Sequence, residues 1–545
     1  MRIAALARGL EHSALLDDAP QVEVTDITND SRRVTPGALY AALPGERFDG
    51  HRFIPAAIES GASAVLCESL PARRTGGVAW LHAPHARLAL SELADRLFGS
   101  PSRELEVIGV TGTDGKTSTV YFIHQLLARL DGASAFLSTS GMQIGPDEKP
   151  NALHQSTPEA PEVHRALRAM RDAGARYAVL ESTSHGLSRR SCRLAHVRYR
   201  AAVFTNLTHE HLEYHGSFEQ YRSDKANLFR ALDAGCYADA GQPDVGSHEP
   251  ARGGAAVPGR ATTRTGGAAV PGRATTRTGG TEGPFGVVNA DDPHSAYFVA
   301  ATARPVLTYG CTPGADYRAA DVSLSPNGAS FTLLTPGGSA ACSLAIPGRF
   351  NVANALAAAA VVHALTGCDE TELAAAIASL RPVHGRMSVV ASEPFSLVVD
   401  YAHTPGSFEN VLPFFRERTA GRLLVVFGSA GERDVGKRPI QGEIAGRYAD
   451  VIVLADEDPR GEDRMQILRD IASGTTGRAE GRDLLLIPDR RLAIRRALEL
   501  ARPGDTVLLL GKGHETSIIG PTAAAPWDEM AVAREELARL RAGSG

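Results

Sequence analysis

The sequence predicts an α/β protein in which helices alternate with mostly parallel strands. Residues 105–130 run from an apolar, β-rich segment through a glycine-rich turn into an amphipathic helix. Strand-like runs such as YAVLES (177–182) and RLLVVFGS (422–429) are followed by helical patterns. Such alternation is typical of parallel sheets, which bind ligands at the carboxyl ends of their strands.

The same pattern divides the chain into three predicted domains. Residues 1–98 alternate short strands and helices, residues 99–380 form a larger α/β unit, and residues 381–545 contain a second series of strands and helices. A chain of 545 residues is long enough for about three or four domains.

Composition and charge argue against several classes of protein. The 57 basic and 62 acidic residues give a net charge of -5, which disfavours an obligate nucleic-acid binder or a membrane-surface protein. The six cysteines form no C-x-x-C pair, so we expect reduced thiols. There is no signal pattern and no apolar stretch of about 20 residues, so we expect a cytoplasmic protein without membrane insertion.

One segment has a composition unlike the rest of the chain. GGAAVPGRATTRT occurs at 253–265 and again, unchanged, at 266–278. It is rich in Gly, Thr and Arg and poor in large apolar residues, so it cannot form a core. We predict a low-complexity insertion at about 240–282; a nucleic-acid-binding arm, built on its arginines, is the alternative.

The glycine-rich turn TGTDGKTS (111–118) has the features of a phosphate-binding loop. Its glycines allow backbone N–H groups to point inward, and the following helix N-terminus adds positive potential. Lys116 can reach the terminal phosphates and Thr117 can offer a hydroxyl to Mg²⁺. The match to G-x-x-x-x-G-K-[ST] is imperfect because Val110 replaces the first glycine, so a turn that merely packs a helix on a strand is the alternative.

Acidic and histidine side chains follow two later strands. Glu181 ends the first, and a carboxylate beside a phosphate loop is a natural Mg²⁺ ligand. The second strand leads into THEHLEYHG (208–216), ahead of Lys225. H-E-x-x-H is absent, which disfavours a zinc site; a polar loop without catalytic function stays open.

Many short strings together resemble the Mur ligase family, the ATP-dependent amide-forming enzymes of peptidoglycan precursor synthesis. The resemblance spans nearly the whole chain outside the repeats, and within the family it is to the type that adds the third amino acid. The matching strings include NDSRRVTPGALYAALPGERFDGHRF (29–53), TGTDGKTST (111–119), ESTSHGL (181–187), FTNLTHEHLEYHG (204–216), VDYAHTPGSFENVL (399–412), DEDPRGED (456–463) and GKGHET (511–516).

The resemblance implies a fold and a reaction. The family has three domains, which bind the UDP substrate, ATP and the amino acid; the central sheet is of the P-loop ATPase type and the C-terminal domain is Rossmann-like. We therefore expect a ligase that adds a diamino acid to UDP-N-acetylmuramoyl-L-alanyl-D-glutamate, with ATP and Mg²⁺, through an acyl phosphate. A monomer is the expected state. A related ligase of the same plan, or a catalytically silent nucleotide-binding scaffold, is the alternative.

The resemblance also assigns site residues. ATP is implied to contact Gly112, Thr113, Asp114, Gly115, Lys116, Thr117, Ser118, Asn354, Arg386 and Asp400. The uridine part of the UDP substrate is implied to contact Asn29, Ser31, Glu46, Arg47 and Phe48, and its muramoyl-dipeptide part is implied to contact Ser156, Thr157, Thr183 and Arg193. Mg²⁺ is implied to bind Thr117, Glu181, His211 and Lys225, with Lys225 carbamylated; Lys116, Lys225, His211 and Glu181 are the implied catalytic residues. Because SRRSCR (188–193) differs in length from the family pattern, Arg193 is the least secure of these.

The implied amino-acid pocket departs from the family at one position. Its implied residues are Arg433, Glu457, Asp458, Pro459, Arg460, Gly511 and Glu515. In the family, DNPR marks enzymes for meso-diaminopimelate, whose distal carboxylate pairs with the arginine. Arg460 is retained but Asp458 replaces Asn, and an anion there favours a purely cationic tail such as lysine or ornithine. We give the arginine more weight and expect meso-diaminopimelate.

Deleting residues 253–278 should leave ligase activity and the melting temperature almost unchanged, because a duplicated low-complexity insertion contributes no core. Activity assays and a thermal melt of the deletion variant check this. A large loss of either would show that the segment packs on the protein or contacts a substrate.

Overall fold

The computed structural model describes residues 1–10, 14–15, 21–45, 48–150, 156–208, 212–235, 281–325 and 328–543. Glu46, Arg47, His211 and the tandem repeat at 253–278 lie outside the described residues. Three main sheets, each with its own helices, account for most of the described chain.

The N-terminal sheet has the strand order β1-β5-β4-β3-β2, parallel except for β1. Its elements are α1 (Ile3–Leu6), β1 (Ala14–Leu15), β2 (Asp26–Thr28), η1 (Ser31–Arg33), β3 (Ala38–Ala42), η2 (Gly50–Phe53), α2 (Ile54–Glu59), β4 (Ala64–Cys67), β5 (Ala79–His82) and α3 (Ala86–Leu97). The segments after β2 and β3, which hold the predicted uridine contacts, therefore leave the sheet at one edge.

The central sheet has the order β16-β15-β14-β13-β12-β11-β6-β10-β7-β8-β9. Its strands are β6 (Glu106–Thr111), β7 (Ser134–Leu137), β8 (Gly141–Ile144), β9 (Asp147–Pro150), β10 (Tyr177–Glu181), β11 (Ala201–Phe204), β12 (Phe285–Asn289), β13 (Val306–Gly310), β14 (Tyr317–Ser325), β15 (Gly328–Leu334) and β16 (Ser339–Leu344). Pairing is parallel from β7 to β14 and antiparallel at both ends. β6 lies in the middle, so the phosphate loop that follows it starts from the most buried part of the sheet.

Helices cover both faces of this sheet. They are η3 (Pro101–Arg103), α4 (Lys116–Leu130), α5 (Ala160–Asp172), α6 (Ser184–Leu187), α7 (Leu212–His215), α8 (Phe218–Ala234), α9 (Ser295–Val299), α10 (Arg349–Thr366) and α11 (Glu370–Ala378). α4 follows the predicted amphipathic pattern, with Val120, Ile123 and Leu127 buried on one face.

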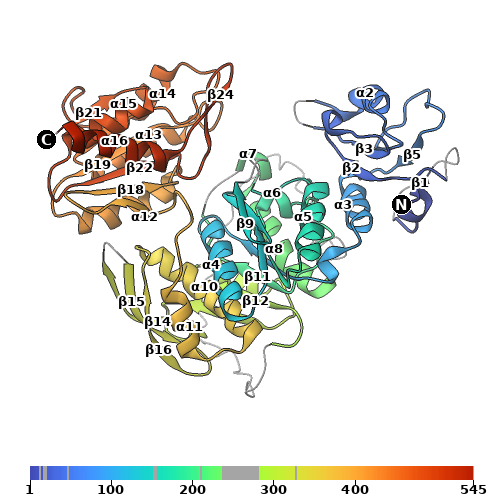
Figure 1. The fold of residues 1–545 in the computed structure, drawn as a ribbon, viewed down its shortest axis with the longest axis horizontal. Helices are drawn as coiled ribbons and strands as arrows, with labels where there is room; N and C mark the ends of the chain where they lie inside the picture. Colours follow the sequence, from blue (N-terminus) through green and yellow to red (C-terminus); the bar gives the residue numbers. More distant parts are fainter. Residues whose placement is uncertain are drawn as a thin grey trace, which may run out of the picture.

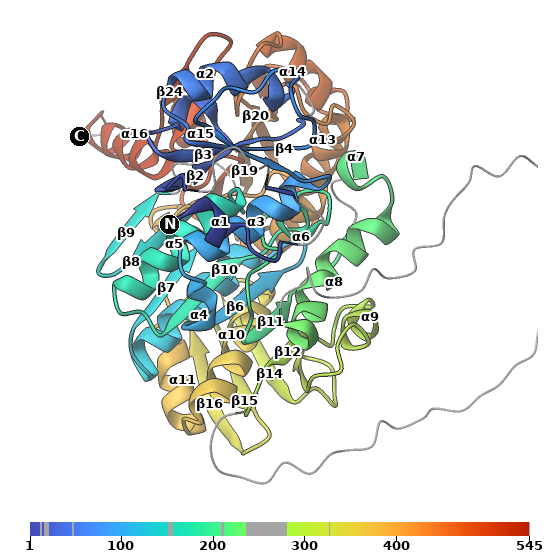
Figure 2. The same ribbon diagram turned by 90° about the vertical axis from the view of Figure 1, so that its right-hand side faces the viewer.

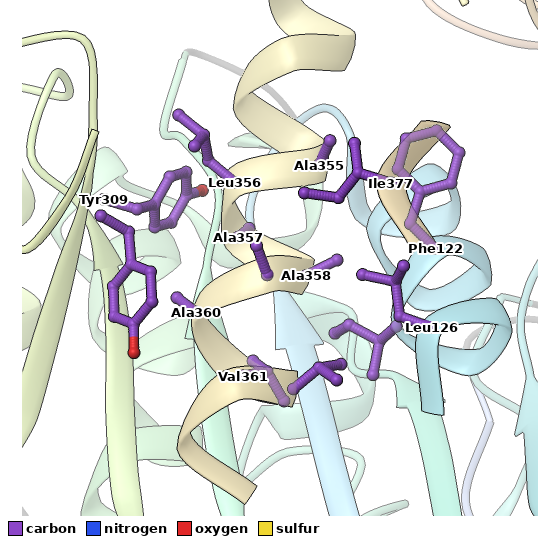
Figure 3. Close-up of a cluster of buried hydrophobic side chains, with 14 of the residues drawn as sticks. Phe122, Leu126, Tyr309, Ala355, Leu356, Ala357, Ala358, Ala360, Val361 and Ile377 are labelled. Atoms are coloured by element: carbon purple, nitrogen blue, oxygen red, sulfur yellow. The ribbon is translucent and has the colours of Figure 1, made fainter. Parts of the chain in front are cut away.

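α10 packs closely against α4. Its sequence NALAAAAVV buries a run of small side chains, and Figure 3 shows Ala355 and Ala358 facing Phe122 and Leu126 of α4. Side chains this short let two helices approach closely while larger residues on the partner fill the space. This packing places the N-terminal turns of both helices side by side, next to the phosphate loop.

The C-terminal sheet has the order β17-β18-β22-β19-β20-β21, parallel except for β17. Its elements are β17 (Ser388–Ala391), β18 (Ser396–Asp400), α12 (Pro405–Arg418), β19 (Leu423–Phe427), α13 (Lys437–Tyr448), β20 (Val451–Leu454), α14 (Arg464–Ala472), β21 (Leu484–Leu486), α15 (Arg490–Leu500), β22 (Thr506–Leu510), β23 (Ser517–Ile519), β24 (Ala524–Pro526) and α16 (Glu529–Gly543). β23 and β24 form a separate antiparallel pair.

In Figure 1 the N-terminal and C-terminal sheets lie apart, both above the central one. In the turned view of Figure 2 one lies in front of the other, and both are again above the central sheet. The predicted limits at 98 and 380 fall between α3 and β6 and between α11 and β17. The expected α/β class with parallel sheets is confirmed, whereas antiparallel β14–β16 extend the central sheet beyond the parallel pattern. Cys67, Cys192, Cys311, Cys342 and Cys368 form no disulfide; Cys236 lies outside the described residues.

Candidate active site

The loop between β6 and α4 has the conformation of a phosphate-binding turn. Gly115 has a left-handed φ of 80°, and a Cβ there would lie 2.5 Å from Oδ1 of Asn354 in α10, so only glycine fits. The Asp114 N–H donates to Oδ1 of Asn206 at 2.8 Å, and the Thr113 N–H donates to the Asn206 carbonyl at 2.8 Å. The loop is thus held between α10 and the segment that follows β11.

Glu181 lies beside the start of α4. Its Oε2 accepts a hydrogen bond from the Thr117 hydroxyl at 3.0 Å and another from the Thr139 N–H at 2.8 Å. The residue is only 4% exposed. Lys116 turns back on its own loop and donates from Nζ to the Thr113 carbonyl at 2.6 Å. A carboxylate, a hydroxyl and an ammonium therefore converge where nucleotide phosphates are expected.

Lys225 is buried under the phosphate loop. It is 2% exposed on α8, and its Nζ donates to the Gly112 carbonyl at 2.6 Å. Nζ also lies 4.4 Å from the centroid of the Tyr221 ring, whose hydroxyl contacts the Thr113 hydroxyl at 3.1 Å. Lys225 is therefore a buried residue of this site and not a surface lysine.

A cavity of about 530 Å³ opens from the phosphate loop toward the C-terminal sheet. Its central-domain wall includes the phosphate loop, Ser118, Ser156, Glu181, Thr183, Lys225 and Asn354. Its other wall includes Arg386, Asp400, Tyr401 and the start of α12. All of the predicted ATP residues except Gly112 thus line one cavity, although they come from segments far apart in the sequence.

Arg386 and Asp400 form the C-terminal wall in different ways. Arg386 donates from Nη2 to the Thr117 hydroxyl at 3.3 Å and stacks over the Tyr401 ring at 4.8 Å. Asp400 accepts from the backbone N–H groups of Met387 and Ala402, each at 2.8 Å. Burial raises the pKa of Asp400, which these hydrogen bonds partly offset. Asp400 thus also holds the link between the central and C-terminal sheets.

Asp458 forms an ion pair with a buried lysine. Nζ of Lys512, which is fully buried, lies 2.8 Å from Asp458 Oδ1 and also pairs with Glu515. The Ile519 N–H donates to the same Asp458 oxygen at 2.9 Å. The extra anion expected from this departure therefore shares a buried cation with Glu515, which weakens its repulsion of a second carboxylate.

Glu457 and Arg460, which lie close to Asp458 in the sequence, have polar atoms available to a ligand. Within the described part of the chain, Oε2 of buried Glu457 has no hydrogen-bond partner, and it lies 3.1 Å from where a Cβ on Gly511 would be. In the same described ranges the Arg460 guanidinium forms no ion pair, and its buried Nε has no hydrogen-bond partner. Arg433 is exposed in a turn tied to the Asp458 carbonyl through the Gly431 N–H at 2.8 Å. A carboxylate and a guanidinium can thus each accept a ligand group.

The predicted dipeptide contacts lie together beside Glu181. The Thr157 hydroxyl donates to the Glu181 carbonyl at 2.9 Å and accepts from the Thr183 hydroxyl at 3.0 Å. Arg193, the least secure of the predicted substrate contacts, donates from Nη1 to the Thr157 carbonyl at 2.9 Å. It therefore lies with the other predicted dipeptide contacts.

The predicted uridine contacts lie in the N-terminal unit. Asn29 and Ser31 follow β2, whereas Phe48 follows β3 and is 67% exposed. An exposed phenylalanine at the carboxyl edge of a parallel sheet offers a surface on which a base can stack.

Two residues of the site, Tyr401 and Lys512, were not predicted from the sequence. Tyr401 donates from its hydroxyl to Glu515 Oε1 at 3.2 Å while its ring contacts Arg386, so it joins the nucleotide wall to the amino-acid pocket. Lys512 lies within GKGHET, where only Gly511 and Glu515 were assigned a function. Tyr401 and Lys512 follow the carboxyl ends of parallel strands β18 and β22, where ligand-binding residues collect. This position in the sequence pattern could have identified them.

Family models match most of the chain. The Mur ligase family catalytic domain matches residues 23–96, the Mur ligase middle domain matches 110–238 and 278–362, and the Mur ligase glutamate ligase domain matches 385–513. The chain belongs to the Mur ligase family. The resemblance inferred from the sequence motifs is therefore confirmed.

Individual Mur ligases match over nearly the full length. A UDP-N-acetylmuramyl-tripeptide synthetase of Roseiflexus sp. (strain RS-1) is 45% identical over 96% of both chains. A UDP-N-acetylmuramoyl-L-alanyl-D-glutamate–2,6-diaminopimelate ligase of Geobacillus thermodenitrificans is 36% identical, covering 95% of this chain and 96% of the relative. A solved structure of a ligase with the latter name has 28% identity and a TM-score of 0.62, and the match covers 99% of each chain.

Replacing Lys116 with alanine should reduce product formation by about 10²- to 10³-fold or more, because its ammonium is the point charge beside the expected phosphates. Steady-state assays check this, with circular dichroism to confirm folding. Arg129→Ala, at an exposed position of the same helix, is the matched control. Near-normal turnover by a folded Lys116→Ala protein would contradict the role of this loop in ATP binding.

Proposed function

We propose that this protein is the ATP-dependent ligase that adds a diamino acid to UDP-N-acetylmuramoyl-L-alanyl-D-glutamate during peptidoglycan synthesis. The observation that carries the proposal is a single cavity with the phosphate loop on one wall and Tyr401, hydrogen-bonded to the amino-acid pocket, on the other. Relatives of this length and similarity are named for UDP-N-acetylmuramyl-tripeptide synthesis. They also disfavour the alternative of a catalytically silent scaffold.

The reaction activates a carboxylate with ATP. A carboxylate acylates amines poorly, so the γ-carboxylate of the D-glutamate attacks the γ-phosphate of ATP and gives an acyl phosphate and ADP. The incoming amine then attacks the acyl carbon, and phosphate leaves. Lys116 offsets the repulsion between carboxylate and triphosphate, while the start of α4 offers backbone N–H groups to the phosphates.

The residues around Glu181 fit Mg²⁺. Thr117 and Glu181 offer a hydroxyl and a carboxylate within hydrogen-bond distance of each other, and hard oxygen donors of this kind suit the ion. We propose His211 as a further ligand on the family pattern. Mg²⁺ supplies charge neutralisation for the transferring phosphoryl group.

We propose that Lys225 acts as a carbamate. An unmodified ammonium would repel a nearby dication, whereas a carbamate offers two anionic oxygens. Carbamylation leaves one hydrogen on Nζ, which can keep the bond to the Gly112 carbonyl. Lys225 is buried beneath the phosphate loop, so it does not serve as a solubilising charge on the surface. Its burial supports a function in catalysis.

The third amino acid is proposed to be meso-diaminopimelate. Arg460 fits a distal carboxylate, while Glu457 and Glu515 fit ammonium groups. A diamino acid with a carboxylate on its tail uses all of these groups at once, and Asp458 is already paired with Lys512, which it shares with Glu515. L-Lysine and L-ornithine are the alternatives, favoured by the number of carboxylates in the pocket.

Two broader expectations are retained as part of the proposal: a monomeric state and a cytoplasmic location. In the described part of the chain, no helix is both long and apolar enough to cross a membrane.

Lys225→Ala should lower kcat by at least about 100-fold, and short carboxylates such as formate should restore part of the activity, because they replace the lost anionic oxygens. Steady-state kinetics with and without formate test this. Lys149→Ala, at an exposed lysine of β9, is the control. Full activity of Lys225→Ala would rule out the proposed function of this side chain.

Comparing kcat/KM for meso-diaminopimelate, L-lysine and L-ornithine tests the amino-acid specificity. We expect meso-diaminopimelate to be the best substrate and Arg460→Ala to lower its kcat/KM by about tenfold to 100-fold, the loss of a charge-assisted pair. Arg469→Ala, on the exposed part of α14, serves as the control. A preference for lysine or ornithine that Arg460→Ala leaves unchanged would overturn the assignment.

A further inference from the structure

Glu159 lies between two arginines that come from different parts of the molecule. It precedes α5 in the central unit; Arg87 is on α3 of the N-terminal unit and Arg193 follows α6. Arg193 Nη2 is 2.8 Å from Glu159 Oε1, and Arg87 Nη1 is 3.5 Å from Oε2. The three side chains are 19–27% exposed, so bulk solvent screens this contact only in part.

The cluster carries an excess of positive charge. Across the described ranges, Glu159 is the one carboxylate that pairs with either Arg87 or Arg193. Among the residues that the structure describes, the buried Nε of Arg193 has no hydrogen-bond partner. Two guanidinium groups that share one carboxylate, with a donor left over, form a site that can accept a further or a different anion.

The cluster also lies between the two predicted ends of the substrate site. Arg87 donates from Nη2 to the Pro44 carbonyl at 3.2 Å, at the start of the segment expected to hold uridine. Arg193 donates from Nη1 to the Thr157 carbonyl at 2.9 Å, in the segment expected to hold the dipeptide. One substrate molecule that reaches both segments must pass close to Glu159.

We propose that Glu159 occupies the position of a substrate anion and is displaced from Arg193 when the UDP-dipeptide binds. This inference rests on the proposed function, since it needs a substrate with an anionic group at this place. The UDP-dipeptide offers two sources of that chemistry, the diphosphate and the carboxylates of the glutamate residue. Displacement breaks one ion pair and forms another, without a covalent step.

Two consequences follow for binding. Glu159 holds the Arg193 guanidinium in place before substrate arrives, and it competes with weakly anionic or neutral ligands. Part of the substrate's binding energy is used to displace it, so removing its charge should tighten substrate binding. Neutralising a residue that only fixed the two units together would not tighten substrate binding.

The test measures binding to the full-length protein by calorimetry. We expect Glu159→Gln to lower Kd for UDP-N-acetylmuramoyl-L-alanyl-D-glutamate by roughly threefold to tenfold, the range of a partly exposed charge pair. KM for this substrate should fall in parallel, and KM for ATP should not. The Glu159 side chain does not cap α5, so glutamine should leave the helix intact.

Two further variants make the result specific. Glu162→Gln, three residues along the same helix, removes another contact between the units, the 2.8 Å pair with Arg33, and should leave Kd unchanged. Arg87→Gln should raise Kd, because the bound anion loses one of its two cations. Because this variant shifts Kd in the other direction, the proposal stays testable if Glu159→Gln fails to fold.

A second nucleotide, UDP-N-acetylmuramoyl-L-alanine, identifies the anion. If Glu159→Gln tightens binding of only the glutamate-containing nucleotide, the anion is a carboxylate. If it tightens binding of both nucleotides, the anion is the diphosphate. An unchanged or weaker affinity of Glu159→Gln, an equal shift in Glu162→Gln, or an unchanged Kd in Arg87→Gln would overturn the proposal. Wild-type protein that neither binds the dipeptide nucleotide nor makes ADP would instead contradict the ligase function itself.

Discussion

The close packing of α10 on α4 is the constraint on which the nucleotide site depends. The alanine-rich face of α10 lets the two helices approach until Asn354 lies against Gly115. The same amide accepts a hydrogen bond from Thr119 at 3.3 Å. A larger side chain at Ala355 or Ala358 would push the helices apart and move Asn354 away from the phosphate loop. Core packing and nucleotide geometry are therefore set by the same contact.

The link between the central and C-terminal sheets depends on a few polar contacts. Arg386 reaches the Thr117 hydroxyl from one side and stacks on Tyr401 on the other. Tyr401 then reaches Glu515, which shares Lys512 with Asp458. Such a chain of small, partly polar contacts suits a ligase that must close to exclude water from an acyl phosphate and open to release products.

Several ion pairs join the N-terminal unit to the central unit. Arg33 pairs with Glu162, and Arg165 pairs with Asp26, in addition to the contact of Arg87 with Glu159. Ion pairs of this kind give orientation and specificity, and each contributes little to affinity. Substrate anions that enter this boundary can therefore change its contacts at low energetic cost.

The sequence by itself determined the α/β class, the phosphate loop, the polar residues at strand ends and the family, because these depend on local periodicity and on short strings. It did not determine which charges meet. The burial of Lys225 against Gly112 joins residues 113 positions apart, and the pairing of Asp458 with Lys512 joins residues 54 apart. Arg193 and Arg87 meet at Glu159 only because α3 packs on α5. Contacts of this kind follow from the packing of whole elements, so only the tertiary structure decided them.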